Sequence, residues 1–193
     1  MNSFSFYQAP VSNVTPCRTV GVEQIYNLIR GDGYRPATEE LRRLRRRADE
    51  GRATRRDVQR FKARRFDYAT FSGVFTRRAE NALVSHSGLI CFDFDHIGSW
   101  RGGGLLAGVY GLRHALMHDT AVDTALIFRS PGGDGLKWVV RIDPLQGTHA
   151  EWFDSLAFYV SRNYGVAPDP SGRDVCRACY LPWDPDAVMP AER

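Results

Sequence analysis

The chain has 193 residues, a formal net charge of +4 at pH 7 and a hydrophobic content of 43%. These values predict one globular domain, and no apolar stretch approaches the length that a membrane-spanning helix requires. The N-terminus also lacks the basic start and the apolar run of a secretion signal, so we expect a cytoplasmic protein with no membrane partner.

Residues 1–87 are interpreted as an N-terminal extension of short β-like pieces and helices. The three helices predicted there are 22–30, ended by Gly31; about 39–50, capped by Thr38; and one to about residue 65, capped by Thr54. From Arg42 to Arg65, twelve basic residues stand against three acidic ones, a local balance of +9, so the remainder of the chain carries −5. The basic character therefore belongs to the last two of these helices.

This arginine-rich pair of helices has two interpretations that the sequence leaves open. It can be a solvated helical face, or a surface that binds nucleic acid or a second subunit. If nucleic acid binds, the candidate phosphate contacts are Arg42, Arg45, Arg46, Arg55 and Arg56, together with Arg141 further along the chain.

From residue 88 onward, strands and helices follow one another in a regular order. The predicted elements are a strand over 89–95, a helix over about 105–118, strands over 124–129 and 136–142, a helix from the Thr148/Glu151 capping box to about 163, and a strand over about 175–181. This β-α-β-β-α-β order predicts an α+β fold with an RRM-like or ferredoxin-like core over 88–193, an antiparallel sheet with two helices on one face. In that topology the third strand lies beside the first, and the fourth lies on the other side of the first.

The first of these strands ends in two aspartates, Asp93 and Asp95. Because residues i and i+2 of a strand point to the same face, the two carboxylates lie side by side, and they repel each other unless a cation lies between them. Oxygen ligands of this kind suit Mg²⁺ or Mn²⁺. Two solvated acids that protect a strand end are the alternative interpretation.

The predicted topology brings further polar groups to the same edge of the sheet. The glycine-rich loop 130–135 joins the second and third strands, and Asp169 and Asp174 precede the fourth strand. Either of these aspartates is a candidate for a third carboxylate beside Asp93 and Asp95. Three polar clusters found separately therefore converge on one candidate site.

The two faces of the sheet are expected to differ. The residues predicted to point to the helices are Phe92, Phe94, Trp138, Val140 and Ile142, and those predicted to lie on an open surface are Asp93, Asp95, Lys137, Val139 and Arg141. Lys137 is one of only two lysines beside 24 arginines, which indicates a specific need for lysine there. This layout fits a metal-bound polyphosphate whose phosphates lie towards Lys137 and the amides of the glycine loop.

Cys176 and Cys179 form a C-x-x-C pair near the end of the chain. No second such pair and no paired histidines follow, and a closed zinc site needs four ligands. We therefore expect both cysteines to be ordinary packing residues.

These residues resemble the archaeo-eukaryotic primase (primase-polymerase) superfamily, and in particular its bacterial and mobile-element branch, often labelled a VirE-type N-terminal domain. The resemblance covers roughly residues 60–186. The motifs that carry it are Cys91-Phe92-Asp93-Phe94-Asp95, Ser130-Pro131-Gly132-Gly133-Asp134-Gly135-Leu136-Lys137, and Asp169 with Arg177, supported by Lys62, Phe71-Ser72-Gly73-Val74-Phe75, Ser87-Gly88-Leu89-Ile90 and Leu181-Pro182-Trp183-Asp184-Pro185.

The resemblance implies a nucleotidyltransferase that joins NTPs or dNTPs on a single-stranded DNA template with two divalent ions, Mg²⁺ or Mn²⁺. The implied catalytic metal ligands are Asp93, Asp95 and Asp169, the last favoured over Asp174 by its spacing to Arg177. The implied nucleotide contacts are Ser130, Gly132, Gly133, Lys137 and Arg177. Many members have histidine where Lys137 stands, although the branch resembled here often carries lysine. A basic residue at this position keeps the phosphate contact and leaves catalytic competence open. The family also implies replication of a mobile element or phage, with a helicase module in the same chain or as a partner.

Other functions remain open. A non-enzymatic RRM-like domain that binds single-stranded nucleic acid would read bases with aromatic residues on the face that here carries Asp93 and Asp95. A replication-initiator or relaxase nuclease needs a His-x-His metal pair, and none of the five histidines is spaced that way. A nucleotide cyclase also uses paired aspartates on such a sheet. A catalytically silent primase-like domain of a larger replication protein would keep the fold without the activity.

Overall fold

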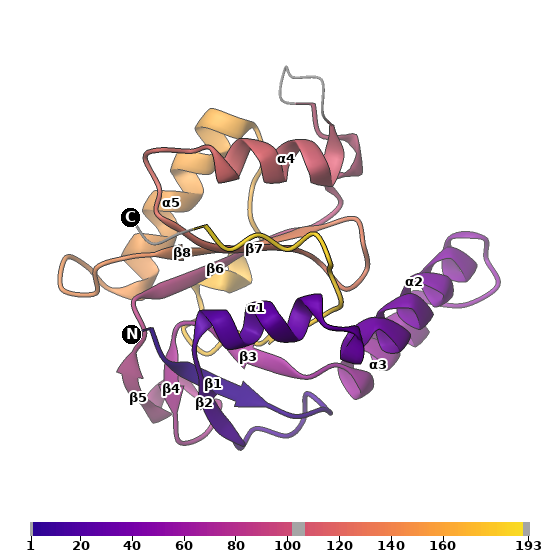
Figure 1. Ribbon diagram of the computed structural model, residues 1–193, viewed down its shortest axis with the longest axis horizontal. Helices are drawn as coiled ribbons and strands as arrows, with labels where there is room; N and C mark the ends of the chain where they lie inside the picture. Colours follow the sequence, from indigo (N-terminus) through magenta and orange to yellow (C-terminus); the bar gives the residue numbers. More distant parts are fainter. Residues whose placement is uncertain (1, 102–106, 191–193) are drawn as a thin grey trace.

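The computed structural model describes residues 2–101 and 107–190. Within them the chain is an α+β fold of three antiparallel sheets and five α-helices (Figure 1). The strands are β1 (Phe4–Tyr7), β2 (Arg18–Val20), β3 (Tyr68–Thr70), β4 (Gly73–Phe75), β5 (Leu83–His86), β6 (Leu89–Phe94), β7 (Thr124–Arg129), β8 (Leu136–Arg141) and β9 (Cys179–Tyr180). The α-helices are α1 (Val22–Arg30), α2 (Arg35–Asp49), α3 (Arg55–Arg65), α4 (Gly108–Met117) and α5 (His149–Tyr164), and the short 3₁₀ turns are η1 (Asp32–Tyr34), η2 (Glu80–Ala82), η3 (Ile97–Ser99) and η4 (Pro170–Arg173). None of the helices in these two ranges combines the length and the apolar character that crossing a membrane would take.

The central sheet has the order β6-β8-β7. The first and third predicted strands pair as expected, and Asp93 of β6 lies directly opposite Lys137 of β8. Helices α4 and α5 cover one face of this sheet, shown at the top of Figure 1. The residues predicted to face the helices do so: Phe92, Phe94, Trp138 and Val140 are fully buried in that layer, with Ile142 packed against it.

The predicted fourth strand does not join this sheet. Only Cys179–Tyr180 is a strand in the predicted 175–181, and it pairs with β3 in a second sheet of order β2-β1-β3-β9. A loop takes the expected place of the fourth strand beside β6, where the Asp169 N–H donates to the Asp93 carbonyl oxygen at 2.7 Å. On the opposite edge, Ile127 of β7 and Val188 exchange backbone hydrogen bonds. Both edges of the central sheet are therefore covered by segments that follow α5.

The second face of the central sheet, predicted to be open, is covered by the N-terminal part of the chain. Val139 is fully buried and Lys137 is only 8% exposed. Phe4, Phe71 and Phe128 belong to the one apolar cluster that fills the space between β1, β3 and the central sheet. The prediction of an open face was wrong because it assumed that only one face of the sheet is apolar. Both faces of β7 are apolar, so both faces of the sheet are covered. An open aromatic surface of the RRM type is not present on this face.

Helix boundaries follow the capping chemistry with one exception. Thr54 and Thr148 each form a reciprocal capping box, with Asp57 and Glu151, as predicted for the helices that they start. Thr38 is not a cap, because α2 begins four residues before the predicted start, with a proline in its first turn, where no N–H is needed. The hydroxyl of Thr38 instead accepts a hydrogen bond from the Trp183 N–H at 2.8 Å.

Candidate metal and nucleotide site

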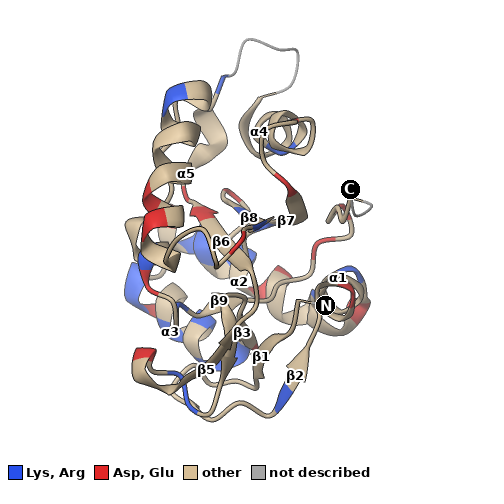
Figure 2. Ribbon diagram, turned by 90° about the vertical axis from the view of Figure 1, so that its left-hand side faces the viewer, with Lys and Arg blue, Asp and Glu red and all other residues tan. Residues whose placement is uncertain are grey.

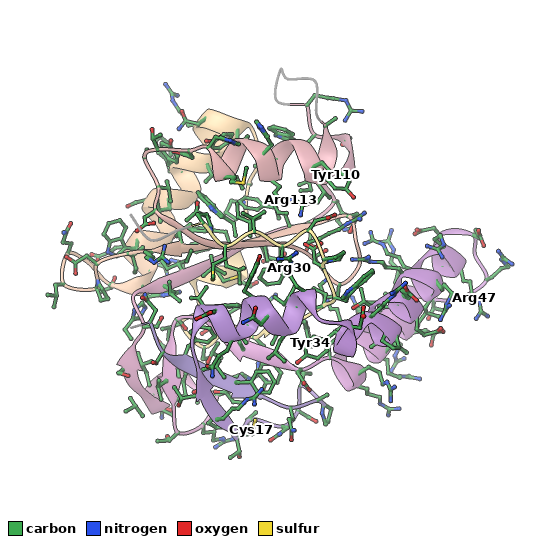
Figure 3. The ribbon with its side chains drawn as sticks, in the orientation of Figure 1. Cys17, Arg30, Tyr34, Arg47, Tyr110 and Arg113 are labelled. Atoms are coloured by element: carbon green, nitrogen blue, oxygen red, sulfur yellow. The ribbon has the colours of Figure 1, made fainter. Side chains whose placement is uncertain are left out.

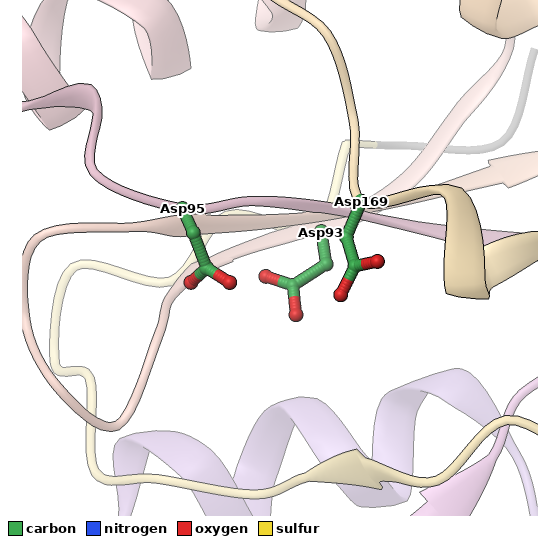
Figure 4. A group of neighbouring side chains, drawn as sticks. All are labelled: Asp93, Asp95 and Asp169. Carbon is green, nitrogen blue, oxygen red and sulfur yellow. The ribbon is translucent and has the colours of Figure 1, made fainter. Parts of the chain in front are cut away.

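Three carboxylates gather at the end of β6, those of Asp93, Asp95 and Asp169 (Figure 4). One oxygen from each lies within 4.8 Å of the others. The pleat of β6 puts Asp93 and Asp95 on the same side. Asp169 joins them because its backbone bonds to Asp93 and because its own side chain accepts from the Ser171 N–H at 2.9 Å, which starts η4. The site is thus assembled by a strand and by the loop that replaces the missing neighbour strand.

The Asp174 carboxylate, the other candidate for the third acid, is used elsewhere. It is exposed and accepts a hydrogen bond from the Cys176 N–H at 2.9 Å. Asp169 instead accepts from the Arg177 guanidinium at 3.2 Å. Of the two candidates, Asp169 is therefore the one that lies beside Asp93 and Asp95.

Asp93 is paired with the cation opposite it in the sheet. The Lys137 ammonium donates to Asp93 Oδ2 in a largely buried ion pair. Although burial acts against it, the Asp93 charge raises the pKa of Lys137 well above its ordinary value. The second oxygen, Oδ1, is buried and has no hydrogen-bond partner within the described residues. A buried carboxylate oxygen without a donor is costly, and a cation is the ligand that would satisfy it.

The pKa values of the two other acids shift in opposite directions. Burial, with repulsion from Asp93, raises the pKa of Asp95. Burial also acts to raise that of Asp169, but the Ser171 hydrogen bonds and the Arg177 charge outweigh it and lower its pKa. Burial and the Asp93 charge therefore disfavour the charged form of Asp95, which a bound cation would favour.

The glycine-rich loop between β7 and β8 closes on itself beside the acids. Ser130 Oγ accepts from the Gly135 N–H at 3.2 Å, so this hydroxyl holds the loop. A Cβ atom on Gly135 would lie 2.5 Å from the Phe94 carbonyl oxygen and 3.2 Å from Asp95 Oδ1. Glycine is therefore needed at 135 to let the loop approach the end of β6.

Two arginines of α2 pack on the same loop. Arg45 forms a bidentate ion pair with Asp134, which also accepts from His96 Nδ1 at 2.9 Å. Arg42 lies over Gly133, where an added Cβ would be 3.1 Å from its Nε. Gly132 and Gly133, predicted as nucleotide contacts, thus leave space for the guanidinium groups of Arg45 and Arg42. Arg45, predicted as a phosphate contact, is paired with the Asp134 carboxylate.

The remaining predicted nucleic-acid contacts fall into two groups. Arg46, Arg55 and Arg56 are exposed on α2 and α3, where Figure 2 shows a concentration of basic residues and Figure 3 shows the neighbouring Arg47 at the outer end of α2. Arg141 lies at the far end of β8, opposite Leu89, and pairs with Asp123 at 3.1 Å. Alternation along a strand indicates a face but not a distance, and Arg141 lies at the opposite end of β6 from Asp93.

A cleft of about 550 Å³ lies between Asp93 and Asp95, the glycine-rich loop and the helices α2 and α3. The side chains that line it include Arg45, Lys62, Asp93, Asp95, Ser130, Asp134, Lys137 and Tyr180. Lys62 of α3 was not predicted as a site residue. Its signal was present in the sequence, because it is the only lysine besides Lys137.

The two cysteines of the C-x-x-C pair have separate contacts in the structure. Cys179 is buried with its sulfur 3.6 Å from that of Cys91, whereas the Cys176 thiol contacts Asp174 at 3.1 Å. The two cysteines therefore have different neighbours, which agrees with the prediction that they are packing residues.

The sequence was compared with protein families, with curated proteins and with solved structures. The sequence model of one family, described as "BT4734-like, N-terminal domain", matches residues 60–189, about two thirds of the chain. No curated protein matches the chain, and no solved structure does. The matched segment contains all three acids, the glycine-rich loop and both lysines.

Proposed function

The chain belongs to the BT4734-like N-terminal domain family, and we propose that it is a metal-dependent nucleotidyltransferase of the primase-polymerase type. In this proposal it joins NTPs or dNTPs on a single-stranded DNA template in the cytoplasm, during replication of a mobile element or phage and alongside a helicase module. Its core is taken as RRM-like over β6 to α5, with the fourth strand moved to the neighbouring sheet.

The observation that carries the proposal is the group of Asp93, Asp95 and Asp169 beside a glycine-rich loop and two cations. The donor set consists of carboxylate oxygens, which suit Mg²⁺ or Mn²⁺. Asp93 Oδ1, buried without a partner, offers a ready ligand atom. These residues fit a divalent cation. When bound there, such ions lower the pKa of an attacking hydroxyl and neutralise charge on a leaving pyrophosphate.

The protein's own groups would position the nucleotide. Lys137 pairs with Asp93 and Arg177 pairs with Asp169. Each would provide a cation for the triphosphate, and the planar fork of Arg177 can bind two oxygens. The exposed arginines of α2 and α3 would hold template phosphates, which makes template binding weaker at higher salt. Phosphoryl transfer of this kind depends on positioning and charge compensation more than on a protein nucleophile.

The test is a primer-extension assay with a single-stranded template, NTPs or dNTPs, and Mg²⁺ or Mn²⁺. The wild-type protein should extend the primer, and Asp95→Asn and Asp169→Asn should each reduce extension by about two orders of magnitude or more. Asp174→Asn is the matched control, because that carboxylate is nearby but bonds to Cys176. No extension by the wild type, or equal loss in all three variants, would contradict the proposal.

A second candidate function is favoured by one contact. Because Lys137 already neutralises Asp93, the acids can serve as a structural charge cluster in a catalytically silent domain that binds single-stranded nucleic acid through α2 and α3. Such a domain would bind template with the same affinity in EDTA as in Mg²⁺, and Asp95→Asn would leave that affinity unchanged.

A further inference from the structure

Both lysines of the chain line the same cleft. Lys62 comes from α3, and Lys137 comes from β8; Asp93 and Asp95 lie in the same lining. In Figure 4 the carboxylates of Asp93, Asp95 and Asp169 all point towards the helices drawn below the strands. Lysine carries a compact, strongly hydrated charge that can move between partners, unlike the fixed fork of arginine. The only two lysines of a chain with 24 arginines therefore line one cleft.

The two lysines differ in what they contact. Lys137 is paired with Asp93, whereas the ammonium of Lys62 makes no hydrogen bond or ion pair with the described residues and lies 5.2 Å from the centre of the Tyr180 ring. Burial, with repulsion from Lys137, lowers the pKa of Lys62, although the charges of Asp93 and Asp95 act to raise it. A largely buried ammonium held near a second one is unfavourable unless an anion joins them.

The charges of the site balance when it is empty of ligands. Asp93, Asp95 and Asp169 carry three negative charges, and Lys62, Lys137 and Arg177 carry three positive ones. A divalent cation that binds alone adds charge to a neutral cluster and must compete with Lys137 for Asp93. A polyphosphate that binds alone meets three carboxylates. Bound together, the two ligands compensate each other and each finds oppositely charged partners.

We propose that this cleft binds a divalent cation and a polyphosphate as a coupled pair, with Lys137 exchanged from Asp93 to the phosphates and Lys62 as the second phosphate-binding lysine. The proposal rests on the proposed function, since a nucleoside triphosphate is the polyphosphate concerned. Coupling of this kind is reciprocal: each ligand raises the affinity for the other by the same factor. The alternative is that both lysines are fixed counter-charges of the acids and contact no ligand.

The experiment uses the full chain and two probes, Mn²⁺ alone, followed by electron paramagnetic resonance, and the preformed Mn²⁺–tripolyphosphate complex, followed by calorimetry. Lys137→Met should bind Mn²⁺ alone about tenfold more tightly, because the competing ammonium is gone, and bind the complex about tenfold more weakly. Lys62→Met should weaken binding of the complex without weakening that of Mn²⁺ alone. Arg60→Met, on the same helix with an exposed side chain, is the matched control and should change neither affinity.

The two substitutions also separate the alternatives. If the lysines are only counter-charges, removing either one raises the affinity for Mn²⁺ and leaves the complex bound as tightly as before, which overturns the proposal. If thermal unfolding shows that Lys137→Met does not fold, the test rests on Lys62→Met alone. An unchanged affinity of that variant for the Mn²⁺–tripolyphosphate complex would overturn the proposal. If Mn²⁺ binds but Asp95→Asn has no effect on it, the proposed function fails. If Asp95→Asn abolishes Mn²⁺ binding while tripolyphosphate adds nothing, only the coupling fails.

Discussion

Asp93 connects the parts of the site through both its backbone and its side chain. Its carbonyl oxygen accepts from the Asp169 N–H, and its carboxylate accepts from Lys137. The strand pairing that places Lys137 opposite Asp93 therefore also fixes the charge balance of the site. Small displacements at the end of β6 should therefore change the positions of all three carboxylates.

A substitution at Gly135 tests the effect of a displacement at the end of β6 without changing any charged residue. Gly135→Ala would place a methyl group against the Phe94 carbonyl oxygen and Ser130 Oγ, at 2.5 and 2.9 Å. We expect a loss of about 1–3 kcal/mol of unfolding free energy from this overpacking, together with weaker Mn²⁺ binding. Urea denaturation and Mn²⁺ titration measure the two effects. Gly33→Ala, where an added Cβ meets nothing within 4 Å, should change neither; equal effects at both positions would contradict this account.

Single residues of the site could be predicted from the sequence where a short-range rule applied. The alternation of a strand was enough to place Asp93 and Asp95 on one face, and the β-α-β-β-α-β order placed the strand of Lys137 beside them. Lys62 stands out as one of only two lysines, but it was missed because nothing local indicates that α3 folds back across the end of β6. Arg45 was predicted as a phosphate contact, whereas its partner Asp134 is distant in sequence and becomes a neighbour only through the packing of α2 on the glycine-rich loop.

At the scale of elements, two histidines link the β4–β5 hairpin to the turn that follows Asp169. The Gly88 N–H donates to His86 Nδ1, so the proton of His86 is on Nε2, which lies 3.1 Å from His149 Nδ1; His149 Nε2 then donates to the Gly172 carbonyl oxygen. Both rings are neutral in this arrangement. Burial, with repulsion from His149, lowers the pKa of His86 to about 4, and burial lowers that of His149 despite the nearby Asp174.

This pair predicts a pH dependence of stability. Because the folded pKa of His86 lies below the unfolded value of about 6.5, the unfolded chain takes up the proton first, and stability is lost as the pH falls from about 6.5 towards 4. His86→Gln should flatten this dependence in urea denaturation between pH 7.5 and 5. His118→Gln, an exposed histidine, is the control and should keep the wild-type slope. A wild-type slope in the His86 variant would contradict the claim that the buried, neutral His86 makes the unfolding free energy depend on pH.

Elements were predictable where their signals are local. Helix α1, the capping boxes of α3 and α5, and the three strands of the central sheet could all be predicted from residues within one or two turns. The last strand could not, because the sequence 175–181 does not indicate whether β6 or β3 is its partner. In the structure the loop with Asp169 lies beside β6, and the last strand pairs with β3 instead. This arrangement depends on the whole fold.

At the scale of the whole molecule, the N-terminal extension and the core share one apolar interior. Phe4 of β1 is fully buried, with its ring centre 4.7 Å from that of Phe71, which in turn lies 6.3 Å from Phe128 of β7. These three rings connect the N-terminal sheet to the central one. The extension therefore completes the face of the sheet that carries Lys137 and holds α3 over the site.

We expect this shared interior to unfold as one unit. All four tryptophans lie between residues 100 and 183, so their fluorescence reports on the core, whereas Phe4→Ala removes a ring from the N-terminal sheet. The substitution should cost about 3–5 kcal/mol and lower the midpoint seen by tryptophan fluorescence as much as that seen by circular dichroism. Val84→Ala, 63% exposed, is the control. A shift confined to circular dichroism would mean that the two parts unfold separately.

The central claim is that Asp93, Asp95 and Asp169 share divalent cations next to a nucleotide. A crystal structure of the full chain with Mn²⁺ and a non-hydrolysable nucleoside triphosphate tests it most directly, since the anomalous signal of manganese identifies the ions. The account predicts manganese bound by oxygens of all three aspartates, with Lys137 moved from Asp93 to the phosphates and Lys62 in contact with them. Carboxylates that point apart, with no manganese between them, would contradict it.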